Sequence, residues 1–243
     1  MKKICTVIIT LSLAGSTAYG QLYIKGGLGY ALSLGGMQID RDRTETATLD
    51  QFKYHYGAFG GGFEIGGAAG YAVTSSVAFE LGLWYEIGQT YKATDVRLNA
   101  NQNRTTEYSG SLFGFSPALI VSGEMGNMRP YARFGILIGL PSTKSVETRP
   151  NNVTTLTYSG GMLFGFHGGT GVLLPLQGNL AIFVELALQG GSWGPTKVED
   201  KTGATTTATT LKTDFNSSEP FVSDQPSLPF GNIGVRAGVK LNP

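Results

Sequence analysis

VAFELGLWYEIG, residues 77–88, alternates strictly between two kinds of side chain. Every odd-numbered position carries a large apolar residue, whereas the even-numbered positions carry Ala, Glu, Gly or Trp. Successive side chains of a β-strand point to opposite faces, so a period of two predicts a strand. One face of this strand is apolar, and the other consists mainly of small and charged residues.

The same alternation recurs along the chain and predicts eight strands. Four further segments show it clearly, and three show it more weakly. The clear segments are 22–34, 131–140, 180–189 and 232–241, and the weaker ones are 54–73, 107–122 and 156–174. No run approaching eighteen apolar residues follows residue 20, so the sequence predicts no transmembrane helix.

Short and long connections alternate between these strands. Three connections are short and consist of turn-forming residues: Thr74-Ser75-Ser76, Gly126-Asn127-Met128 and Gln177-Gly178-Asn179. The other four are long and polar, at about 39–53, 92–106, 142–155 and 195–227. An antiparallel up-and-down meander, with tight turns at one end and long loops at the other, has this arrangement.

Residues 1–20 have the pattern of a secretory signal peptide. A positive start and an apolar stretch from about Ile4 to Ala14 lead to the small-x-small site Ala18-Tyr19-Gly20. The apolar stretch is too short to span a membrane. We therefore expect an exported chain that is cleaved before Gln21, with a mature domain over residues 21–243.

The composition excludes several classes of function. The single cysteine, Cys5, lies in the predicted signal peptide, so we expect neither disulfide bonds nor a thiolate metal site. Without Lys2 and Lys3 the chain has 16 basic and 17 acidic residues, which argues against a nucleic-acid partner. His55 and His167 lie far apart in the sequence, and we predict no metal and no cofactor.

The face opposite the apolar one combines glycine with a balanced set of charges. Glycine makes up 36 of 243 residues, about twice the usual share, and leaves room for large side chains in a narrow interior. Alternation places eight charged residues on this face: Lys25, Glu64, Glu80, Glu86, Arg133, Glu185, Arg236 and Lys240. We predict that they point inward as a structural salt-bridge network, with a charged conduction path as the alternative.

A secreted soluble barrel of the lipocalin type would alternate in the same way, with its apolar face inward. Its surface would then be rich in glycine and sparse in charge, which is unusual for a soluble protein. The sequence therefore favours an all-β, transmembrane antiparallel β-barrel with the apolar face outward. Tyrosines near the strand ends, Tyr131 among them, would form interface girdles or pack inside.

The chain resembles the small outer-membrane β-barrel family that includes the eight-stranded OmpA-like and OmpX-like barrels of Gram-negative bacteria. The residues that carry the resemblance are Phe59-Gly60-Gly61-Gly62-Phe63-Glu64-Ile65-Gly66, Tyr131-Ala132-Arg133-Phe134-Gly135-Ile136 and Gly234-Val235-Arg236-Ala237-Gly238-Val239-Lys240-Leu241. The resemblance covers residues 21–243. It implies a bacterial outer-membrane location, periplasmic turns, extracellular loops, surrounding outer-membrane lipid, and contact with the barrel-assembly machinery during biogenesis.

His167 is the first candidate for catalysis, because it falls on the inward face of segment 156–174. A histidine there would act as a general base in a barrel-embedded hydrolase or lipid-modifying enzyme. Ser159 and Ser192 are not paired with a histidine in the sequence, so no hydrolase motif is present. We predict a polar residue that fills the lumen, and no catalytic residue.

The sequence leaves three functions open. We predict a non-enzymatic outer-membrane protein with a structural or surface-interaction role and a side-chain-filled lumen. The alternatives are a narrow channel for small or hydrophobic solutes, similar to OmpW-type barrels, and a lipid-modifying enzyme. An extracellular ligand would bind the long loops, where residues 205–213 would extend the neighbouring strands as a hairpin; solvated loops without a ligand are the alternative.

Overall fold

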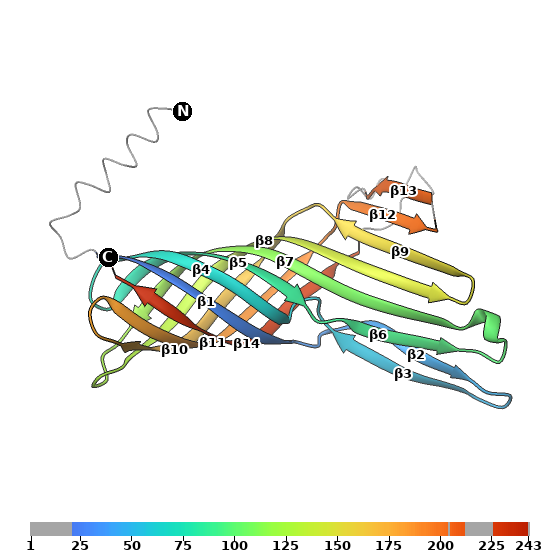
Figure 1. Cartoon of the computed structure of the whole chain (residues 1–243), viewed down its shortest axis with the longest axis horizontal. Helices are drawn as coiled ribbons and strands as arrows, with labels where there is room; N and C mark the ends of the chain where they lie inside the picture. Colours follow the sequence, from blue (N-terminus) through green and yellow to red (C-terminus); the bar gives the residue numbers. More distant parts are fainter. Residues whose placement is uncertain (1–20, 204, 212–225, 243) are drawn as a thin grey trace.

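A closed β-barrel forms the body of the molecule, and β-hairpins project from one of its ends (Figure 1). The structure, a computed structural model, describes residues 21–203, 205–211 and 226–242. The predicted signal peptide at residues 1–20 lies outside the described residues. No helix in the described part of the chain is long and apolar enough to cross a membrane.

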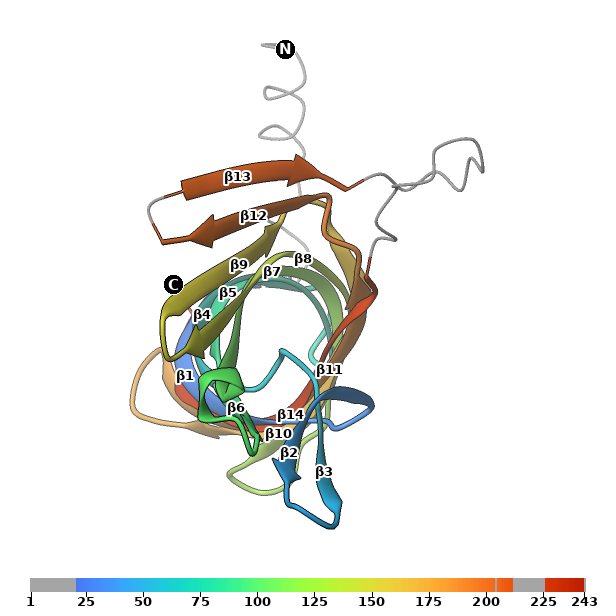
Figure 2. The same ribbon diagram turned by 90° about the vertical axis from the view of Figure 1, so that its right-hand side faces the viewer.

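Eight strands, here called the staves, form the barrel wall. Each stave is antiparallel to both neighbours, and the last pairs with the first, so the ring is closed (Figure 2). The staves are β1 (Gln21–Ser33), β4 (Gly62–Ala72), β5 (Val77–Gly88), β7 (Arg104–Ser122), β8 (Arg129–Arg149), β10 (Leu163–Pro175), β11 (Leu180–Trp193) and β14 (Leu228–Leu241). The predicted eight-stranded antiparallel barrel is confirmed.

The two ends of the barrel differ as the connections predicted. At the turn end, where β1 begins and β14 ends, short turns join the staves at 73–76, 123–128 and 176–179. Gly126 and Gly178 have φ of 58° and 72° in two of these turns, a conformation that glycine adopts readily. At the opposite end, the hairpin end, all four connections are long.

The described parts of the long connections contain further β-strands, beyond the eight that the alternation predicts. They contain β2 (Met37–Glu45), β3 (Asp50–Gly57), β6 (Tyr91–Val96), the 3-10 helix η1 (Ala100–Gln102), β9 (Asn152–Ser159), β12 (Lys197–Thr202) and β13 (Thr205–Thr210). These strands continue the sheet beyond the barrel in the orders β8-β9-β12-β13 and β7-β6-β2-β3. Strands β12 and β13 therefore pair beside β9 and do not extend β11 and β14; residues 212 and 213 of the expected hairpin lie outside the described residues. Most residues of these strands are polar and at least partly exposed, so the strands carry little hydrophobic alternation.

Two segments that we expected to be single strands are each broken at the barrel mouth. Segment 54–73 divides into β3 and β4 next to Gly61 and Gly62, whose φ angles are 101° and 137°. Segment 156–174 divides into β9 and β10 at Gly160 and Gly161, with φ of 75° and 74°. The prediction of continuous strands was wrong because these glycines turn the chain out of the stave direction.

The apolar face points outward, as predicted. Large apolar side chains on every stave are more than a third exposed, and together they form a belt around the barrel. One such side chain from each stave is Leu28, Ile65, Leu83, Phe113, Ile136, Phe166, Val184 and Val235. An exposed apolar surface of this extent fits a surrounding of lipid.

The inward face holds the large side chains against glycines of neighbouring staves. A Cβ added to Gly66 would lie 2.6 Å from Cβ of Trp84, and one added to Gly171 would lie 2.8 Å from the Tyr131 ring. The high glycine content thus makes room for a filled interior.

Candidate functional site

The lumen at the hairpin end contains an apolar cluster, here called the plug. Its members are Phe59, Trp84, Leu112, Leu137, Leu163, Trp193 and Phe230. Five of them are at most 1% exposed, and the rings of Trp193 and Phe230 meet edge to face at 6.0 Å. Both tryptophans of the protein therefore lie in the plug.

Residues 57–62, which link β3 to β4, are all buried, and the chain passes inside the ring after β3 (Figure 2). The amide of Phe59 donates to the carbonyl of Pro229 at 2.9 Å. The amide of Ala58 donates to Oγ of Ser33, which donates in turn to the Ala58 carbonyl, at 2.8 and 3.0 Å. This segment is therefore fixed to the wall by its backbone while Phe59 fills the mouth.

Glu86 also holds residues 57–62 in place, from the side of the segment that faces the turn end. It has no basic partner among the described residues. One carboxylate oxygen accepts the amide N–H of Gly61 at 2.6 Å. The other accepts side-chain amides of Gln189 at 2.6 Å and Asn232 at 3.0 Å. Sequence reasoning missed these two amides, although both occupy inward positions of predicted strands.

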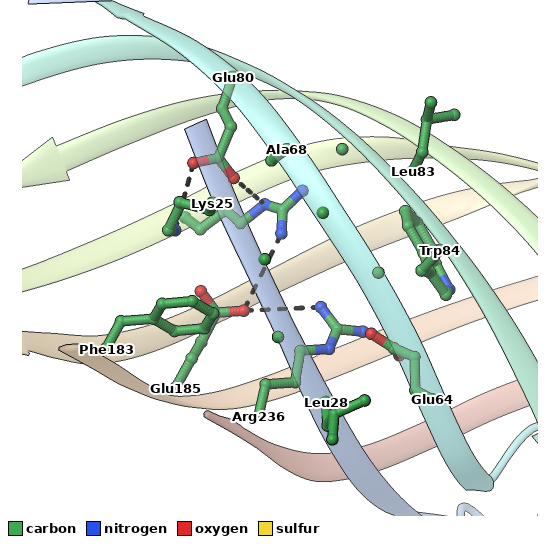
Figure 3. Close-up of a pocket in the computed structure, with 16 residues that line it drawn as sticks. Lys25, Leu28, Glu64, Ala68, Glu80, Leu83, Trp84, Phe183, Glu185 and Arg236 are labelled. Atoms are coloured by element: carbon green, nitrogen blue, oxygen red, sulfur yellow. Dashed lines mark hydrogen bonds and ion pairs between the residues drawn. The ribbon is translucent and has the colours of Figure 1, made fainter. Parts of the chain in front are cut away.

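A charged layer lies next to the plug and joins six of the eight predicted charges. Figure 3 shows five of them, Lys25, Glu64, Glu80, Glu185 and Arg236. Arg236 lies 2.7 Å from Glu64 and 3.5 Å from Glu185. Arg133 lies 4.0 Å from Glu185 and 3.6 Å from Glu80, and Glu80 also lies 3.2 Å from Lys25. The side chains in this chain of contacts are between 1% and 11% exposed. Charges this deeply buried must be paired, because moving one unpaired ion out of water costs on the order of several kcal/mol.

Two tyrosine hydroxyls donate hydrogen bonds to carboxylates of this layer. Tyr23 donates its hydroxyl to Glu80 at 3.0 Å, and Tyr131 donates to Glu185 at 2.9 Å. Both rings are buried inside the barrel, so Tyr131 packs inside rather than at the lipid interface.

His167 lies fully buried between the plug and the charged layer. Its ring is 4.5 Å from that of Trp84, and its Nε2 forms a hydrogen bond with Arg236. Since a guanidinium can only donate, the imidazole Nε2 accepts this bond. Within the described residues no hydrogen bond joins His167 to a carboxylate or a hydroxyl.

Lys240 and Glu86 are the two predicted charges that form no ion pair among the described residues. They lie at opposite ends of the charged layer, Glu86 beneath the plug and Lys240 near the turn end. Lys240 Nζ stacks 3.9 Å from the ring centroid of Tyr23. A cavity of about 340 Å³, lined in part by Tyr23 and Lys240, occupies the turn end of the lumen. We call this cavity the vestibule.

Charged side chains also link the projecting strands. Asp95 on β6 lies 3.0 Å from Arg97 and 3.3 Å from Arg104. Burial by itself would raise the pKa of Asp95, but the hydrogen bonds from Arg97 and the charges of both arginines outweigh it and lower the pKa. Asp42 on β2 accepts from the Thr94 amide at 2.8 Å and lies 2.8 Å from His55, so it joins two hairpins. No group of three or more possible metal ligands occurs in the described ranges.

Comparison with known proteins shows the fold. No family model and no curated protein sequence matches the chain. A major outer membrane protein from Thermus thermophilus is 13% identical, with a TM-score of 0.51, over 91% of this chain and 98% of that one. Neisserial surface protein A is 11% identical, with a TM-score of 0.41, over 91% and 96%. The outer membrane protease OmpT from Escherichia coli is 10% identical, with a TM-score of 0.36, over the same shares.

The similarity to the Thermus thermophilus protein shows the fold alone. The other two proteins have TM-scores below 0.5, and no conclusion is drawn from them. The closed ring of eight antiparallel staves and the outward apolar belt agree with that fold. The chain therefore has the fold of a small outer-membrane β-barrel.

Proposed function

We propose that this protein is a non-enzymatic barrel of the bacterial outer membrane with a side-chain-filled lumen, and that its projecting hairpins act at the cell surface. The observation that carries the proposal is that two layers of side chains fill the inside of the barrel. The plug fills the hairpin end, and a connected set of buried ion pairs fills the middle. An eight-stranded barrel is just wide enough for such side chains.

The outward belt and the fold support the location in the outer membrane. In this setting the turn end faces the periplasm and the hairpin end faces outward, since short periplasmic turns and long external loops are usual for such barrels. The predicted signal peptide would deliver the chain to this membrane.

The surroundings of His167 support a non-enzymatic role. The side chain is 0% exposed, and Trp84 and Arg236 occupy two of its sides. A general base needs hydrogen-bond reach to a substrate proton, directly or through one water. The plug stands between His167 and the hairpin end, so a substrate that arrives at the hairpin end meets the plug before the ring.

The hairpins support a role at the surface. They form two β-layers that extend the barrel sheet beyond the belt, and most of their side chains are polar and at least partly exposed (Figure 1). Cross-strand hydrogen bonds and ion pairs such as Arg43–Asp50, at 2.8 Å, hold them together. A structured surface of this kind offers a partner defined contacts, whereas a disordered loop must first be ordered.

Planar-bilayer recording tests the filled lumen. We expect the folded protein to give no steady single-channel steps, because the plug and the charged layer block the path. The Arg149→Ala variant, which removes a guanidinium that is 55% exposed on a hairpin, is the matched control for Arg133→Ala in the lumen. Steady steps in the wild type that disappear in Arg133→Ala and persist in Arg149→Ala would overturn the proposal in favour of a channel. Fractionation of expressing cells, with heat-dependent gel mobility, tests the location separately.

A further inference from the structure

The eight inward charges balance in number but not in position. Four acids and four bases face the lumen, and the middle of the barrel pairs six of them. The remaining acid, Glu86, is satisfied by three N–H donors beneath the plug. The remaining base, Lys240, faces the vestibule at the other end. The turn end of the lumen therefore carries an excess of positive charge.

The strand register concentrates this charge. Lys25 on β1 and Lys240 on β14 lie directly opposite each other, and both side chains point inward. Like charges in directly opposed positions of an antiparallel pair are destabilising. Glu80 forms an ion pair with Lys25 at 3.2 Å and neutralises its charge. Among the described residues, the ammonium group of Lys240 contacts only the Tyr23 ring. That ring covers one side of the ammonium group and leaves N–H donors for another acceptor.

A third cation faces the same vestibule. Arg129 donates to the Ser75 carbonyl at 2.7 Å, and its Nε is buried without a hydrogen-bond partner in the described part of the chain. Arg129 lies 3.6 Å from Glu124, whose side chain is 77% exposed. Among the described residues, three basic groups and one solvated acid therefore line a cavity of about 340 Å³.

We propose that the vestibule is a binding site for an oxyanion, a phosphate or carboxylate group, held by Lys240 and Arg129. Such a group supplies the acceptors that these two side chains lack, and charge-assisted hydrogen bonds to it are the strong kind. The hydroxyl of Thr74, which also lines the cavity, adds a neutral donor. The site opens at the turn end, on the far side of the charged layer from the plug. The anion therefore enters from the turn end and does not cross the barrel.

Calorimetric titration of the folded protein with inorganic phosphate, in dodecyl maltoside, tests this site. We expect one saturable site per barrel. Lys240→Gln should weaken phosphate binding by about tenfold or more, the effect of losing one charge-assisted hydrogen bond. Glu124→Gln removes the competing acid and should tighten binding by about two- to fivefold, the size of a partly exposed charge interaction. Lys92→Gln, at a 60% exposed lysine of the hairpin end, is the matched control and should change nothing.

Two sources of the oxyanion are separated by repeating the titration in nanodiscs of phosphatidylglycerol. A weakened apparent affinity for phosphate there means that a lipid headgroup occupies the vestibule, and an unchanged affinity means a soluble anion. The absence of saturable binding in detergent, or equal binding by wild type and a heat-modifiable Lys240→Gln, would overturn the site. Failure of this test leaves the filled lumen unaffected, because conductance is measured independently.

Discussion

Substitution of Glu86 by alanine should release the segment that closes the barrel mouth. Glu86 is 1% exposed and accepts three hydrogen bonds, from Gly61, Gln189 and Asn232. Alanine leaves all three donors buried without an acceptor, and each unsatisfied donor costs about 1–3 kcal/mol. Removing the buried charge itself recovers part of this loss. We therefore expect the free energy of unfolding to fall by about 3–5 kcal/mol, the lower part of the range for three donors.

Urea unfolding of the barrel in lipid vesicles, followed by tryptophan fluorescence, measures this loss. Both tryptophans lie in the plug, so their emission reports directly on the region that Glu86 holds. The variant should show a red-shifted emission before urea is added and a lower unfolding midpoint. Glu107→Ala is the control, because the Glu107 side chain is 51% exposed and, in the part of the chain that the structure describes, pairs only with Lys92 at 3.5 Å. A Glu86→Ala variant with the emission and midpoint of Glu107→Ala would refute the anchoring role of Glu86.

Three further predictions concern the belt, the lumen glycines and the hairpins. Ile136→Arg, in the middle of the outward belt of β8, should lower the stability of the lipid-folded barrel by about 2–4 kcal/mol, whereas Ile136→Leu should have little effect; equal midpoints in lipid would contradict the belt. Gly66→Ala places a Cβ 2.6 Å from that of Trp84 and should cost about 1–3 kcal/mol. At Gly26 nothing lies within 4 Å, so Gly26→Ala should change stability by less than about 1 kcal/mol in the same unfolding assay; a similar loss in both variants would argue against steric packing. Because Arg97 and Arg104 lower the pKa of Asp95 in the folded state, the stabilisation from Asp95 is present above the unfolded pKa and is lost as the pH falls through the lower folded value. Amide protection factors of β6 should therefore fall at acidic pH in the wild type and much less in Asp95→Asn, and identical pH profiles would exclude this role of Asp95.

The staves could be predicted from the sequence because lipid and lumen impose opposite requirements on alternate residues. In β5 every odd position faces outward and every even position faces inward, so the alternation gives both the strand and its orientation. The same rule placed all eight charges on the inward face. Pairing between them depends on stagger across the ring, which the sequence of one strand does not contain. Glu86 therefore meets amides rather than a base, and Lys240 meets the Tyr23 ring.

The projecting strands and the plug could not be predicted by the same rule. Residues 205–210 of β13 are exposed at every position, so no hydrophobic period marks the strand. The plug residue Phe59 comes from a connection and not from a stave, and its burial depends on contacts with Phe230 and Pro229, which are distant in sequence. The alternation runs through the glycines around Phe59 and so predicts a continuous strand there.

The length of β8 sets the height at which the molecule meets its surroundings. This strand has 21 residues, and its outward apolar positions end at Leu140. The nine residues from Pro141 to Arg149 add about 30 Å of strand at roughly 3.3 Å per residue. Because β7 pairs with β8 through most of that length, the two strands form a rigid extension of the barrel wall rather than a flexible loop. In the proposed orientation, with the hairpin end outside the cell, another cell or macromolecule would touch the tip of this extension before it reached the lipid headgroups. Antibodies against intact cells should then bind at the tip residues.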